Sequence, residues 1–181
     1  MESRPPLLVT AALSICLILG QLPIMAVPAL TVELADEWQL TASEVGWLWG
    51  IYFAGYVLAL PFLTGATSRM DGRIVYVIAA LISAIASVMA ALFADKFWWG
   101  LALRFIAGVG FAGINIVGMK LLADRLAGDA QARASAIYSG ALAVGSSCSF
   151  LSAGFLSGTF GWQAAFLAAG AGALLSNPNW C

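Results

Sequence analysis

The sequence contains no histidine and few charged residues, and each absence excludes a class of protein. Of the 181 residues, 9% are charged and 62% are hydrophobic, whereas a soluble domain has about 25% charged residues to face water. The missing histidine excludes Ser-His and Cys-His nucleophilic pairs and the paired-histidine zinc sites of metalloproteases. A P-loop nucleotide site is excluded because the sequence has no GxxxxGK[ST] segment. We therefore expect a membrane protein that is not an enzyme and has no metal or other cofactor.

Cysteine is also scarce, and its three copies share no metal-binding or redox spacing. Cys16 and Cys148 fall inside apolar runs, where a thiol behaves as a small hydrophobic group, and Cys181 ends the chain. We expect no disulfide framework. The expected partners are a lipid bilayer and a small solute, and not nucleic acid.

The apolar N-terminus could be a signal peptide or a membrane span. Arg4 precedes an apolar run, and Val27-Pro28-Ala29 resembles a cleavage site. However, the run over residues 7–32 is about twice as long as the apolar part of a signal peptide, and further apolar runs follow it. We therefore favour a span.

Apolar runs of about 20 residues cross a bilayer as helices, because lipid cannot satisfy free backbone amides. The last run would cover only about 20 Å at 1.5 Å per residue, which suggests a truncated polypeptide. The expected fold class is an all-α membrane protein, a six-transmembrane-helix bundle in one domain over residues 1–181. The spans are expected near residues 7–32, 45–64, 74–94, 98–119, 134–157 and 163–175.

Charges and tryptophans predict the orientation of these spans. With the N-terminus inside, one set of connections holds six basic residues, and the opposite set holds Lys96 and five acids. The positive-inside rule therefore places the N-terminus in the cytoplasm. Tryptophans near the outer helix ends are typical of an aromatic belt. The cytoplasmic cations are Arg4, Arg69, Arg73, Lys120, Arg125 and Arg133; the outer acids are Glu33, Asp36, Glu37, Glu44 and Asp95; the belt is Trp47, Trp49, Trp98 and Trp99.

Small residues at every fourth position predict how the helices meet. Such ridges let helix backbones approach closely in lipid. One ridge lies on the second span and a longer one on the fifth, whereas the third span is almost uniformly apolar and is expected to face lipid. The two ridges are Gly46, Gly50 and Ala54, and Ala141, Gly145, Ser149, Ala153 and Ser157.

Four segments together resemble the major facilitator superfamily. GATSRMDGR at residues 65–73 is similar to the family's charged loop, with its aspartate missing or displaced, and residues 104–110, RFIAGVG, fit an R-x-x-x-G-x-G segment. Gly140 and Gly145 resemble a glycine-rich segment in which Ser146 replaces proline. Residues 161–166, GWQAAF, resemble the opening of the sixth helix. The resemblance covers the first half of a twelve-helix fold.

This resemblance implies one half of a secondary transporter, with a solute cavity lined by helices one and four. The missing C-terminal half, or a second copy of the chain, would supply the other wall. In this family the loop is thought to act as a cytoplasmic latch. A plain connector between two helices explains its glycines and arginines equally well, and we leave both interpretations open. The loop candidates are Gly65, Arg69, Asp71, Gly72 and Arg73.

Polar residues inside the first and fourth spans are the candidate solute contacts. Gln21 lies near the middle of its span, beside Pro23, and a buried amide in lipid needs partners. Arg104 is a charge within a span, and Asn115 follows it about three helical turns later, so that Phe111 shares their face. The alternatives are a helix–helix hydrogen bond for Gln21 and a side chain that extends to the interface for Arg104.

The predicted spans contain no acid and no histidine, which limits the coupling mechanism. Arginine does not deprotonate in proteins, so a proton-coupled mechanism would need a carboxylate from outside this chain. Arg104 could instead attract an anionic solute.

We expect a transporter in the plasma (inner) membrane. The alternatives are a structural or assembly protein without transport, in which Gln21, Arg104 and Asn115 are occupied by helix contacts, and, with little support, an intramembrane enzyme.

Overall fold

The computed structural model describes residues 5–94 and 96–177, which form helices joined by short connections. Arg4, Asp95 and Cys181, used above, lie outside the described residues. Within them, four helices are long and apolar enough to cross a membrane, and two apolar helices are shorter. The long helices are α4 (Ala42–Arg69), α5 (Gly72–Phe93), α6 (Phe97–Ala123) and α7 (Gly128–Phe160); the shorter ones are α1 (Pro6–Gly20) and α8 (Trp162–Leu175).

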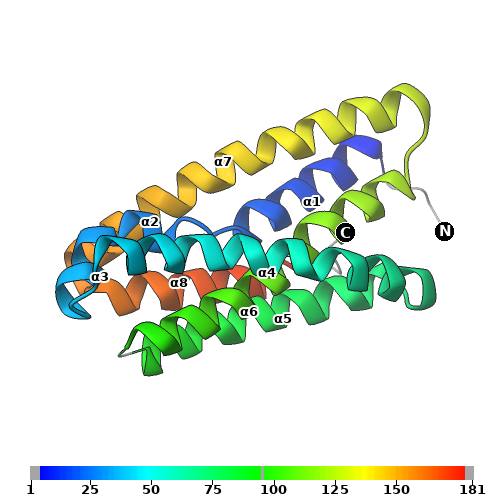
Figure 1. Ribbon diagram of the computed structural model, residues 1–181. Helices are drawn as coiled ribbons and strands as arrows, with labels where there is room; N and C mark the ends of the chain where they lie inside the picture. Colours follow the sequence, from blue (N-terminus) through cyan, green and yellow to red (C-terminus); the bar gives the residue numbers. More distant parts are fainter. Residues whose placement is uncertain (1–4, 95, 178–181) are drawn as a thin grey trace.

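The long helices lie side by side along one axis, with α6 as the central element (Figure 1). Helices α4 and α5 both pack against α6 and touch each other little. Helix α8 covers the other side of α5, and α7 packs along α1. Exposed tryptophans lie in the second turn of α4 and in the first turn of α6, and both helices begin at the same end of the bundle, as an aromatic belt requires.

Large apolar side chains cover the outside of this bundle. Phe62 is 78% exposed, and Leu151 and Phe155 are each 70% exposed. A soluble monomer rarely exposes large contiguous apolar patches, whereas lipid solvates such side chains without cost. The protein is a multi-pass helical membrane protein.

We expected one helical span over residues 7–32, and this prediction is wrong: the first apolar run is divided into three helices. Helix α1 ends at Gly20, residues 21–25 form turns, and two short helices follow, α2 (Ala26–Ala29) and α3 (Thr31–Glu37). Pro23 explains the interruption because proline has no N–H for the helix ladder and its ring clashes with the preceding turn.

We expected the third span to face lipid, but one of its faces is buried inside the protein. One face of α5 carries small side chains, among them Ala80, Ser83 and Ala84, and is buried against α6 and α8. The opposite face exposes larger side chains such as Leu81 and Ile85. Hydrophobicity alone could not separate these faces, because alanine and leucine are both apolar; side-chain size separates them.

The ridge expected on α7 is confirmed, because all five of its small residues are buried. The ridge expected on α4 is wrong. A Cβ atom added to Gly46 or Gly50 would meet no atom within 4 Å. The close approach lies one residue further along: Gly55 faces the carbonyl of Phe105 on α6, and Gly108 of α6 faces the carbonyl of Tyr52, in each case too closely for a Cβ atom.

The contact between α4 and α6 gives the first prediction. In Gly108→Ala, the new methyl group would overlap the backbone of Tyr52, which cannot move aside as a side chain can. We expect a loss of about 3 kcal/mol or more, at the upper end of overpacking costs. Gly50→Ala places the same methyl group in open space and is the matched control. Thermal unfolding in detergent measures both, and equal unfolding temperatures would contradict the proposed contact.

Candidate functional site

The interruption of the first helix leaves backbone groups that lipid cannot satisfy, and side chains of α6 and α7 bind them. Arg104 donates from Nη1 to the carbonyl of Pro23 at 2.6 Å and from Nη2 to that of Ile24 at 3.1 Å. The hydroxyl of Ser149 donates to the Leu22 carbonyl at 2.6 Å and accepts from the Met25 N–H at 3.0 Å. The bend therefore depends on two other helices.

Gln21 lies at the start of this bend and is 1% exposed. Its Nε2 donates to the Leu142 carbonyl at 2.8 Å and to the Ser146 hydroxyl at 2.6 Å. Gly145 makes room for the amide, because a Cβ atom there would lie 2.8 Å from Gln21 Oε1. Within the described residues, that oxygen has no hydrogen-bond partner. The buried amide thus joins the first helix to α7.

Arg104 is 3% exposed and lies inside the bundle, so its side chain does not extend to the membrane interface. Its guanidinium carbon lies 4.6 Å from the centroid of the Tyr52 ring, which is a cation–π distance. Together with the two carbonyls, the ring compensates part of the cost of a buried charge. Among the described residues, neither Arg104 Nε nor the Tyr52 hydroxyl has a hydrogen-bond partner.

Phe111 and Asn115 continue the face of α6 that Arg104 begins, and this face contacts α4. The Phe111 ring lies 6.0 Å from Tyr52 and 5.8 Å from Tyr56, measured between centroids. The amide Nδ2 of Asn115 donates to the Tyr56 hydroxyl at 3.0 Å. Asn115 and Tyr56 are both half-buried, whereas Arg104 and Phe111 are buried.

The charged loop expected at residues 65–73 is shorter in the structure. Gly65 and Arg69 belong to α4, and Gly72 and Arg73 begin α5. Neither glycine has a positive φ, so neither adopts a backbone conformation that requires glycine. Asp71 caps α5 instead, because its Oδ1 accepts from the Arg73 backbone N–H at 2.8 Å. Such a cap satisfies an N–H that the helix leaves free.

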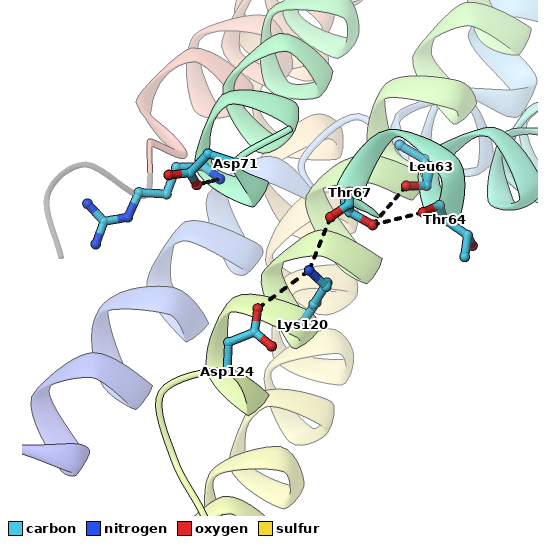
Figure 2. Close-up of polar contacts among 7 residues, drawn as sticks. Leu63, Thr64, Thr67, Asp71, Lys120 and Asp124 are labelled. Carbon is cyan, nitrogen blue, oxygen red and sulfur yellow. Dashed lines mark hydrogen bonds and ion pairs between the residues drawn. The ribbon is translucent and has the colours of Figure 1, made fainter. Parts of the chain in front are cut away.

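The connection is held by a residue that the sequence analysis did not single out as a site. Lys120 of α6 donates from Nζ to the Thr67 carbonyl near the end of α4 at 3.4 Å, and lies 3.5 Å from the Asp124 carboxylate. Figure 2 shows Lys120 between these two partners, with Asp71 apart from them. A cation near a helix C-terminus also interacts favourably with the helix dipole.

Sequence reasoning missed several other partners. Tyr52 and Tyr56 lie four residues apart in the second apolar span, and this spacing on one helix face was the available signal. Glu33 lies on α3 and accepts a hydrogen bond from the hydroxyl of Ser157, a partner that the sequence analysis did not name. Nothing local in the sequence pairs residues so far apart.

Comparisons with known proteins agree with this architecture. The family model described as Major Facilitator Superfamily matches residues 8–177. The chain is also 38% identical over 77 residues to the niacin transporter NiaP of Acinetobacter baylyi (strain ATCC 33305 / BD413 / ADP1). That alignment covers 42% of this chain and 17% of the relative. On the match over nearly its whole length, the chain belongs to the major facilitator superfamily.

Proposed function

We propose that the chain forms one six-helix half of a secondary transporter, and that a small solute passes over the face built by α1, α4, α6 and α7. The observation that carries this proposal is the interrupted first helix, whose carbonyls are bound by Arg104 and Ser149. In transporters, discontinuous helices near the middle of the membrane are where solutes and ions bind. Membership of the family gives the same expectation.

The four candidate residues divide into two roles in this proposal. Asn115 contacts the solute together with Tyr56, because both are half-buried and polar. Gln21, Arg104 and Phe111 are positioning residues: the first two hold the bend, and Phe111 supports the ring of Tyr56. Arg104 can attract an anion only if the solute replaces a carbonyl of the bend.

The finer expectations on location and partners belong to the same proposal. We place the protein in the plasma (inner) membrane with a cytoplasmic N-terminus. The second wall of the cavity comes from a C-terminal half or from a second copy of the chain. The proposed cytoplasmic latch lies next to the contact of Lys120 with Thr67. Its residues are Gly65, Arg69, Asp71, Gly72 and Arg73. The family resemblance supports these roles.

A second candidate function is a structural membrane protein without transport. One observation favours it: Gln21, Arg104 and Asn115 all form hydrogen bonds to other segments of the bundle. A purely structural role would make these side chains matter for stability and not for solute movement. A flux measurement distinguishes the two functions, because only a transporter moves solute across the membrane.

Uptake of radiolabelled nicotinate into proteoliposomes tests transport, and nicotinate is chosen because of the relative's name. We expect uptake above that of protein-free liposomes. Asn115→Ala should reduce it about 5–10-fold, since one hydrogen bond to a charged or polar group is lost. Ile106→Ala, an exposed position on the same helix, is the control. Uptake at the protein-free level, with all proteins folded, would favour the structural function.

Arg104 gives a separate prediction about charge. If the guanidinium attracts anions, Arg104→Gln lowers nicotinate uptake about tenfold more than uptake of the neutral nicotinamide, by the loss of about 1.4 kcal/mol of attraction. Arg104→Lys keeps the charge without the two-pronged contact and should recover part of this selectivity. Undiminished uptake of anionic solutes by Arg104→Gln would refute the anion role and leave Arg104 as a helix anchor.

A further inference from the structure

A groove separates α4 from α5 along the bundle. Both helices pack against α6 and touch each other little, so α6 forms the floor of the groove with Phe105 and Val109. The volume is about 420 Å³, and every side chain that lines it is hydrophobic. Phe62 on its wall is 78% exposed. The groove is therefore open to the surrounding lipid, and none of the candidate solute contacts lines it.

The length of this groove matches one leaflet of a bilayer. On α4 its lining runs from Leu58 to Met70, which is about 18 Å at about 1.5 Å per residue. Half of the hydrocarbon core of a bilayer is about 15 Å thick. Because α4 ends at Arg69, the groove begins where the helix leaves the membrane and reaches about to its middle. It therefore fits one acyl chain of a lipid in that leaflet.

An arginine lies at the end of the groove where α4 leaves the membrane. Arg69 follows the lining residue Phe62 by seven residues, or about two turns, so both project from the same face of α4. Within the described part of the chain, the Arg69 guanidinium forms no salt bridge and no hydrogen bond. A guanidinium can bind phosphate oxygens through two parallel hydrogen bonds. Arg69 is thus free to bind the phosphate of a lipid whose chain fills the groove.

The other charges near this connection are placed differently. Arg73 precedes the lining residue Ile82 by nine residues, or about two and a half turns, so it projects from the face of α5 opposite to the groove. Lys120 is paired with Asp124. One carboxylate oxygen of Asp71 accepts from a backbone N–H at the start of α5. The two arginines and one aspartate of the connection leave one net positive charge, which favours an anionic headgroup.

We propose that an anionic phospholipid occupies this groove, with one acyl chain between α4 and α5 and its phosphate bound by Arg69. Basic pockets between membrane helices bind anionic headgroups in this way. Any arginine near a membrane surface also attracts anionic lipid, whatever its direction. The face from which each arginine projects therefore separates a groove site from general attraction. The inference is independent of the proposed function, because the lipid does not touch the solute face.

Lipid titrations of the purified full chain in detergent, followed by native mass spectrometry, test this site. Dioleoylphosphatidylglycerol and dioleoylphosphatidylcholine have the same acyl chains and differ in headgroup charge. We expect the wild type to bind the anionic lipid about fivefold more tightly, as one arginine at the membrane surface implies. Arg69→Gln should remove this preference. Arg73→Gln removes the same charge from the same connection but from the opposite face, so it is the matched control and should retain the preference.

A second pair of variants tests the position of the acyl chain. Val109→Phe places a ring on the floor of the groove and should weaken the binding of both lipids about fivefold, because the chain loses its contacts there. The control is Ile106→Phe, at an exposed position of α6 that does not line the groove. The arginine variants are on the surface and still test the proposal if Val109→Phe does not fold.

Three results would overturn the proposal. Equal affinities for the two lipids in the wild type would remove the anionic headgroup. Equal losses of preference in Arg69→Gln and Arg73→Gln would show general surface attraction in place of a site. Equal lipid binding by folded Val109→Phe and Ile106→Phe would place the acyl chain outside the groove.

Discussion

The bend in the first helix depends on one constraint: lipid provides no partner for a backbone carbonyl, so the protein must provide every one. Arg104 and Ser149 do this at the bend, from α6 and α7. A single break in one helix therefore fixes the position of two others. The buried charge is tolerated for the same reason, because two carbonyls and the Tyr52 ring replace its hydration.

The same constraint joins the bend to α7. Gln21 donates to the Leu142 carbonyl and to the Ser146 hydroxyl of α7, and Ser149 of α7 binds backbone groups of the bend. A movement of the first helix relative to α7 would therefore break both sets of contacts. Alternating access in transporters is largely a rigid-body movement of one repeat against the other, so these contacts favour a first helix and an α7 that move together.

The α7 and α4 ridges show where sequence reasoning succeeds and where it stops. Both have small residues at every fourth position, but only that of α7 is buried. The periodic spacing says that residues share a face, and it does not say which face meets a neighbour. On α4 the close contact is made by Gly55, because the α6 backbone passes beside this residue and not beside Gly46 or Gly50. The charged connection is similar: we expected a loop over residues 65–73, whereas α4 ends at Arg69 and α5 begins at Gly72.

Local features of the sequence were sufficient to predict the lipid environment, the helical class and the family. Those follow from composition, from the lengths of the apolar runs and from the order of short motifs, which are all local properties. The sequence also identified candidate solute contacts on the first and fourth spans, namely Gln21, Arg104, Phe111 and Asn115. Their partners could not be predicted from local sequence, because Arg104 contacts Pro23 and Ile24, which lie about 80 residues away in the chain. Such contacts depend on which helices pack together, and because lipid and core side chains are both apolar, the hydrophobic pattern of a helix does not specify its neighbour.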